Sequence, residues 1–196
     1  MYIERKNIDW LEIDNLQNAI LSLEIAVEYI ERIPDNLQYW KWVIIGIHNC
    51  LQSFMVLALR GSTPVNIMSE KKAKQWLKAY DEKIKFPNYY LDKFSNLYEK
   101  IKSDRMLMYT NSKKFEPSVN QDRHVSSLNQ FRNAFVHFKV SGWSIYVGGM
   151  KNIILDILKV IEFLAFDSNN LSWPNEQTQE EVQRLLLQGR KNLEEL

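Results

Sequence analysis

The chain has 196 residues, of which 45% are hydrophobic and 25% are charged, and its net charge is +1. These values are ordinary for a globular protein, and the length fits one domain or one domain with an appended helix. Cys50 is the only cysteine, which excludes an internal disulfide framework and a thiolate metal site built by cysteines alone. A cytoplasmic location is expected, and the first residues do not resemble a signal peptide.

The charges are unevenly distributed along the chain. Residues 1–40 carry three basic and eight acidic side chains, whereas residues 69–114 carry twelve basic and six acidic ones. The basic middle segment predicts either a phosphate-binding surface or the solvated faces of amphipathic helices.

Apolar residues recur at helical spacing through the first half of the chain. From Asp9 they recur every three or four residues until Pro34, which predicts a first helix. A second helix is expected over residues 38–60, and because it is apolar nearly all round it should be the central helix of a bundle. Ser69 is expected to cap a third helix, and a fourth is expected over residues 91–101.

The second half is expected to be helical as well, with one interruption. After a loop with a short helix at 103–117, Ser118 is expected to cap a long helix that ends near residue 139. Residues 143–147 alternate between apolar and polar side chains, which predicts a short extended or β segment. Helices are expected over 150–166 and 175–195.

This pattern predicts an all-α protein. Residues 1–166 are expected to form a helical bundle. Residues 167–196 are expected to form a linker and an amphipathic C-terminal helix that packs on the bundle or on a partner.

Residues 42–59 need comparison with a transmembrane helix, because they carry no Asp, Glu, Lys or Arg over 18 residues. Four hydrogen-bonding side chains lie near the centre of the segment: His48, Asn49, Gln52 and Ser53. Such groups are costly at the middle of a bilayer. We therefore expect a buried core helix and no membrane partner.

Residues 118–139 carry two contrasting faces on one helix. Apolar side chains gather on the face expected to meet the core: Leu128, Phe131, Ala134, Phe135 and Phe138. Polar side chains form an opposite stripe, with Arg132 at its edge: Asp122, Ser126, Asn129, Gln130, Asn133 and His137. Asn133 and His137 are four residues apart and can touch, whereas Arg132 and His137 are roughly 140° apart around the axis. The stripe is either a polar surface or a site, and His124 projects toward the core side.

The residue types on this stripe restrict the chemistry. The stripe lacks the three or four ligands of a zinc site and a carboxylate pair, and the chain lacks a P-loop motif. No metal and no cofactor are expected. Imidazole can move a proton near neutral pH, and guanidinium binds phosphate oxygens. Together with an amide, these groups suit metal-independent cleavage of RNA.

The stretch RNAFVH, from Arg132 to His137, resembles the R-x(4–6)-H motif of the HEPN domain superfamily (higher eukaryotes and prokaryotes nucleotide-binding), in which the residue after the arginine is typically polar. The stretch WKWVIIGIHNCLQSFMVLALRG looks like the apolar second helix of such proteins, and RNAFVHFKVSGWSIYV looks like a bacterial HEPN-like branch. The resemblance implies an up-and-down bundle of four to five helices, with the motif near the end of a long helix.

The resemblance also implies a function. It implies an endoribonuclease that acts without a metal, as a homodimer, in a toxin–antitoxin system or in defence against phage, with RNA as substrate and an antitoxin protein as a candidate partner. Two facing motifs would form one composite site, in which His137 is the general acid and base, Arg132 holds the scissile phosphate and Asn133 orients the imidazole. The alternative is an inactive bundle that binds a nucleotide, RNA or a protein.

Three further residues are auxiliary candidates. His48 lies in the middle of the apolar second helix, where it is expected to be a core histidine or, if it lies near His137, a second proton shuttle. Ser126 and Asn129 lie on the polar stripe itself.

Overall fold

The computed structural model describes residues 10–88, 90–137, 142 and 144–196, and within these residues the chain forms helices and no strand. The α-helices are α1 (Asn15–Glu31), α2 (Trp40–Arg60), α3 (Glu70–Asp81), α4 (Phe94–Ile101), α5 (Val119–Val136), α6 (Met150–Glu162) and α7 (Glu176–Glu194). Short 3-10 turns lie at Leu37–Tyr39, Pro64–Ile67 and Asp104–Met106, and a π-helical turn follows α6 at Phe163–Asp167. The predicted all-α bundle is confirmed.

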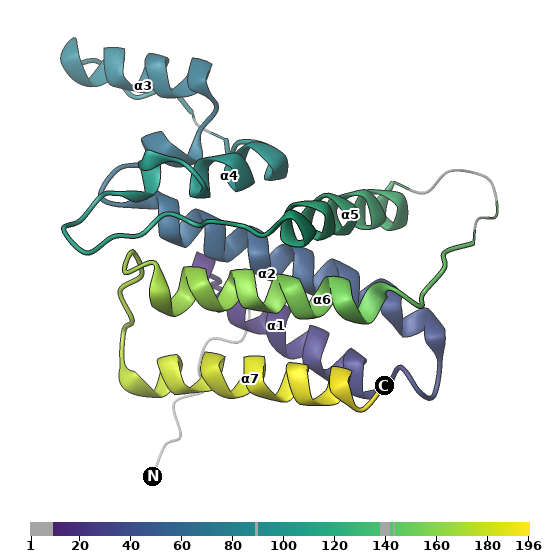
Figure 1. Ribbon diagram of the computed structural model, residues 1–196. Coiled ribbons are helices and arrows are strands. Elements are labelled where there is room, and N and C mark those ends of the chain that lie inside the picture. Colours follow the sequence, from purple (N-terminus) through teal and green to yellow (C-terminus); the bar gives the residue numbers. More distant parts are fainter. Residues whose placement is uncertain (1–9, 89, 138–141, 143) are drawn as a thin grey trace.

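Helix α2 lies at the centre of this bundle and packs against α1, α4, α5 and α6 (Figure 1). The consecutive side chains of Phe54, Met55 and Val56 are all buried, as is Cys50, so the second half of the helix is buried nearly all round, whereas Trp42 near its start is exposed. Burial of each large apolar side chain stabilises the fold by about 1.5–3 kcal/mol. In Figure 1, α5 lies on one side of α2 and α6, and α1 and α7 lie on the other side.

The apolar segment that resembled a membrane span is this central helix. From Leu37 to Arg60 the chain is long and apolar enough to cross a bilayer, and it is the one such helix among the residues described. Seventy-two per cent of its most apolar window is buried inside the protein. That burial is what the core helix of a soluble protein shows.

Helix α1 pairs closely with α2. It begins at Asn15, where Asp14 and Gln17 form a capping box; residues 1–9, where the first helix was expected to begin, lie outside the described part of the chain. Gly46 of α2 permits the close approach, because a Cβ atom at this position would lie 2.8 Å from the backbone oxygen of Ser22.

Several local expectations are corrected in detail. The second helix begins at Trp40, after a 3-10 turn in which the Asn36 side chain accepts from the Gln38 amide (2.9 Å). Ser69 does precede α3, but its side chain makes no capping hydrogen bond. Residues 142 and 144–147 form no strand, and residues 138–141 and 143 are not described.

The C-terminal helix packs on the bundle. Helix α7 lies against α1 and α6, with its apolar face turned inward: Val182, Leu185, Leu186 and Leu193 are buried. Arg190 of α7 binds both carboxylate oxygens of Glu162 in α6, at 3.0 and 2.5 Å. This bidentate pair supplements the apolar contact between the two helices.

Replacement of Gly46 by alanine should destabilise the protein. The new methyl group would meet a backbone carbonyl of α1, which cannot rotate away, so α1 and α2 must separate. We expect the free energy of unfolding, measured by urea denaturation, to fall by about 1–3 kcal/mol. Gly149→Ala is the matched control, because a Cβ atom there meets nothing within 4 Å. Equal stability of the two variants would contradict the close approach.

Candidate functional site

Helix α5 carries the predicted motif, and both of its ends are defined by specific residues. Ser118 and Gln121 form a capping box at its start, as expected for Ser118. The α-helix ends at Val136 rather than near residue 139, and His137 is its C-cap, with a backbone amide that donates to the Asn133 carbonyl (2.9 Å). His137 is exposed. The motif therefore lies over the last turn of α5.

The core face of α5 differs from the predicted one. Val125 and Leu128 are its buried residues, Phe131 and Phe135 are only partly buried, and Ala134 is exposed. The remaining predicted core residue, Phe138, lies outside the described residues. The reason for the difference is that α5 packs against both α2 and α6, so its inward surface is shifted around the axis from the purely apolar face.

This shift turns Asn129 from the predicted outer stripe toward α2. The Oδ1 atom of Asn129 lies 3.1 Å from Nε2 of His48, and because an amide oxygen can only accept, Nε2–H is the donor. The His48 ring is 1% exposed and stacks on Phe94 of α4, with ring centroids 4.1 Å apart. His48 and Asn129, both auxiliary candidates, are thus hydrogen-bonded to each other.

His48 lies close enough to Arg132 to respond to its charge. Burial lowers the pKa of His48 to about 4; the hydrogen bond that His48 donates to Asn129 opposes this change, and the positive charge of Arg132 adds to it. The imidazole is therefore neutral at pH 7, and it offers a fixed hydrogen bond rather than a proton that exchanges at neutral pH. The expectation of a core histidine is met.

Arg132 is half-buried, with no ion pair among the described residues. Its Nη1 donates to Oδ1 of Asn133 (3.1 Å), and its Nε is buried without an acceptor. The other half-buried arginines of the described chain each bind a glutamate: Arg105 binds Glu70, and Arg190 binds Glu162. A partly desolvated cation without a counter-ion is energetically costly, which marks Arg132 as a candidate for binding an anion.

The remaining predicted residues are more dispersed. Ser126 is exposed, and its Oγ accepts from Gln130 within α5 at 3.4 Å, so it takes no part in the His48–Asn129–Arg132 cluster. Asn133 binds Arg132 with its side-chain oxygen, which differs from the role of orienting an imidazole. The structure brings together His48, Asn129, Arg132 and Asn133, with His137 at the exposed end of the helix.

An apolar groove adjoins this end of α5. It has a volume of about 460 Å³ and is lined mainly by apolar side chains of α2, α5, α6 and the segment before α6: Trp40, Ala134, Phe135, Ile145, Val147 and Met150. Val136 and Leu37 are exposed nearby. A surface of this kind is typical of an interface.

A second groove, which is polar, lies between α5 and α6 and contains His124. His124, which was expected on the core side of the helix, is half-buried and faces α6, where its Nδ1 lies 2.8 Å from Oδ2 of Asp156. Lys159 binds the other oxygen of that carboxylate at 3.1 Å, and Arg123 lines the same groove of about 610 Å³. The sequence did contain one signal, since Asp156 is the only acidic residue in the apolar run 150–161.

Neither groove resembles a metal site. Among the described residues, no group of three or more His, Cys, Asp or Glu side chains is arranged to hold a metal ion.

Comparisons of the chain with models of protein families, with curated proteins and with solved structures found no match.

The stability of the protein should depend on the titration of His48. Its pKa is about 4 in the folded chain and 6.5 ordinarily, so between these pH values the unfolded chain binds a proton that the folded chain does not. The contribution of neutral His48 to the free energy of unfolding is fully present above pH 6.5. It is lost as the pH falls toward 4, by about 3 kcal/mol in total. Urea denaturation at a series of pH values should show a difference between the wild type and His48→Gln that shrinks over this window. A constant difference would contradict the assignment.

Proposed function

We propose that this protein is a metal-independent endoribonuclease of HEPN type. One observation carries the proposal: Arg132 is half-buried and, unlike Arg105 and Arg190, has no carboxylate partner among the described residues. A phosphate would supply the missing negative charge and acceptor oxygens. The exposed His137, five residues further along at the C-cap of the same helix, supplies a group that can transfer a proton.

The proposed reaction needs no reactant besides RNA. A base removes the proton of the ribose 2′-hydroxyl, and the resulting oxygen attacks the adjacent phosphorus. The bond from phosphorus to the 5′-oxygen breaks, an acid protonates that oxygen, and a 2′,3′-cyclic phosphate remains. Arg132 would stabilise the negative charge on the phosphate during this step, and imidazoles of His137 would serve as base and acid. The hydrogen bond between His48 and Asn129 would fix the rotation of α5 and so the position of Arg132.

A homodimer is part of this proposal. Arg132 is turned toward α2 while His137 is exposed at the helix end, so one chain presents the two groups in different directions. The apolar groove beside Ala134 and Ile145 gives a second copy a surface to cover. Light scattering should then report a mass near twice 23.3 kDa.

The purified protein should cleave single-stranded RNA in the presence of EDTA and leave 2′,3′-cyclic phosphate ends. Arg132→Ala and His137→Ala should each lower the cleavage rate by at least about 100-fold, since each removes charge stabilisation or proton transfer. Arg132→Lys should retain little activity because an ammonium cannot form the bidentate fork. Arg184→Ala, which removes an exposed arginine of α7, is the matched control.

Stability measurements separate a functional Arg132 from a structural one. Arg132→Ala should leave the free energy of unfolding unchanged or raise it, because it removes an unpaired, half-buried charge. Arg190→Ala should lower it, because it leaves the half-buried pair with Glu162 broken. Cleavage that persists in both motif variants would refute the proposal.

A second candidate function is non-catalytic binding of a nucleotide. The groove between α5 and α6 favours it, because Arg123 and Lys159 supply two cations and Asp156 orients His124 there. The pocket size of about 610 Å³ falls within the usual range for small ligands.

Calorimetric titration with ATP distinguishes this candidate. Binding that weakens in Lys159→Ala and Arg123→Ala, but persists in Arg132→Ala, would favour the nucleotide-binding function. Absence of binding at millimolar ATP would remove it.

A further inference from the structure

Helix α3 and the loop that follows it, residues 70–88, form an arm at the outer edge of the molecule. In Figure 1 this helix lies beyond α4, apart from the bundle formed by the other helices. Ala73 and Ala79 are the buried residues of α3, so most of its side chains face outward. Packing of the protein core therefore does not account for the arm.

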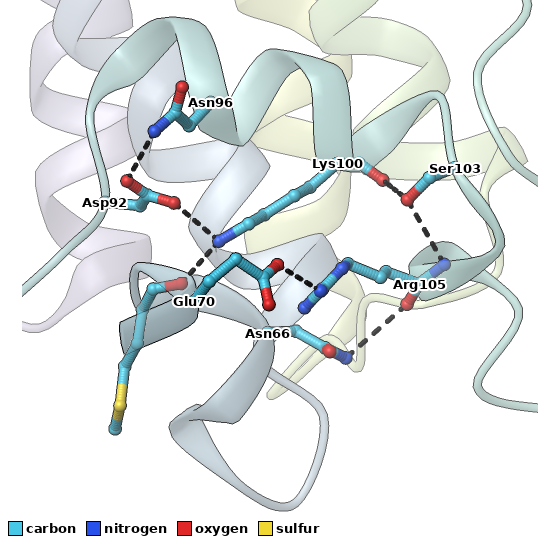
Figure 2. Close-up of polar contacts among 8 residues, drawn as sticks. Asn66, Glu70, Asp92, Asn96, Lys100, Ser103 and Arg105 are labelled. Carbon is cyan, nitrogen blue, oxygen red and sulfur yellow. Dashed lines mark hydrogen bonds and ion pairs between the residues drawn. The ribbon is translucent and has the colours of Figure 1, made fainter. Parts of the chain in front are cut away.

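A polar clamp holds the base of the arm to α4 (Figure 2). The ammonium group of Lys100, which is almost completely buried, donates to the carboxylate of Asp92 (2.7 Å) and to the backbone oxygen of Met68. Arg105 forms an ion pair with Glu70 at the first turn of α3. Because Met68 lies just before the arm and Asp92 just after it, the clamp fixes both ends of the arm.

The arm carries a stack of aromatic rings. The rings of Tyr80 and Trp76 are 10° from parallel with centroids 6.0 Å apart, and those of Trp76 and Phe86 are 15° from parallel at 4.6 Å. Tyr80 is 63% exposed and Phe86 is 47% exposed. Trp76, Phe86 and Pro87 also line a surface hollow with Tyr90. A parallel stack that ends in exposed rings can be extended by another flat ring.

The arm is also basic. Residues 70–88 contain six lysines and three acidic residues, which are Glu70, Asp81 and Glu82. Glu70 forms an ion pair with Arg105, and Oε1 of Glu82 lies 3.6 Å from Nζ of Lys78. Five lysines of the arm have no described ion pair: Lys71, Lys72, Lys74, Lys83 and Lys85. Of these, Lys72 lies four residues before Trp76 on the same face of α3, and Lys85 directly precedes Phe86.

We infer that the α3 arm binds single-stranded RNA, with bases stacked on its aromatic rings and phosphates bound by its lysines. Aromatic rings combined with lysines are the usual means of binding single strands, because every base has a flat face and every nucleotide has a charge. An anionic membrane would also attract lysines, but it needs only apolar area, whereas the near-parallel rings offer the geometry of base stacking. The choice of RNA over DNA rests on the proposed ribonuclease function.

The inference can be tested by fluorescence anisotropy with a labelled oligouridine of about 15 nucleotides. The protein used carries His137→Ala, so that binding is measured without cleavage. Trp76→Ala should weaken binding by about 5- to 150-fold, and Trp76→Phe should restore most of it. Trp42→Ala is the matched control, because Trp42 is a partly exposed tryptophan with Lys41 5.1 Å from its ring centre, on a different helix.

Salt dependence tests the lysines separately. Replacement of both Lys72 and Lys85 by alanine should make the slope of log affinity against log salt shallower by about 0.7 per lysine. Unchanged binding in Trp76→Ala would overturn the inference, provided that circular dichroism shows an intact fold. Binding to vesicles of anionic lipid without binding to the oligouridine would overturn it as well.

Failure of the inference is distinguishable from failure of the ribonuclease proposal. If the wild type binds the oligouridine through the arm but never cleaves RNA, the arm stands and the ribonuclease proposal fails. If the wild type cleaves RNA and Trp76→Ala binds and cleaves equally well, the ribonuclease proposal stands and the arm is not a binding surface.

Discussion

The structure depends on the burial of α2, a helix of 21 residues whose apolar side chains point in every direction. Such a helix cannot lie on a surface, so other parts of the chain must surround it. Helices α1, α4, α5 and α6 do so, and α7 in turn packs on α1 and α6. Arm residues 70–88 lie outside this arrangement, which is why their side chains are available for another purpose.

The few polar groups of α2 determine how its neighbours are rotated. Ser53 accepts a hydrogen bond from the Asn18 amide of α1 (2.8 Å), and His48 donates to Asn129 of α5. A buried polar group without a partner costs about 1–3 kcal/mol, so each bond favours one rotation of the helix that supplies the partner. Since Arg132 follows Asn129 by three residues on the same face of α5, the bond with His48 also carries the arginine into its half-buried position.

Much of the fold could be predicted from the sequence because its signals are local. The apolar run of α2 and the Ser118 cap of α5 each require only neighbouring residues, and both predictions are confirmed. The orientation of α5 could not be predicted in this way. It depends on two helices distant in sequence, which is why Ala134 was wrongly placed in the core and why His124 was not matched with Asp156.

The candidate site shows the same division between local and distant information. The spacing of Arg132 and His137 predicts that one helix presents them in different directions, and in the structure Arg132 is half-buried near His48 whereas His137 is exposed. The sequence could not show that Arg132 lacks a carboxylate partner. The glutamates that bind Arg105 and Arg190 are 35 and 28 positions away along the chain, so such partners cannot be identified from neighbouring residues.

The position of Cys50 has a practical consequence. Its thiol is completely buried in α2, and burial raises its pKa well above the usual range, so the reactive thiolate does not form in the folded chain. An alkylating reagent can modify it only in molecules whose central helix has become uncovered. The rate of alkylation therefore measures how often the surrounding helices separate, and the natural sequence already contains the probe that such an experiment needs.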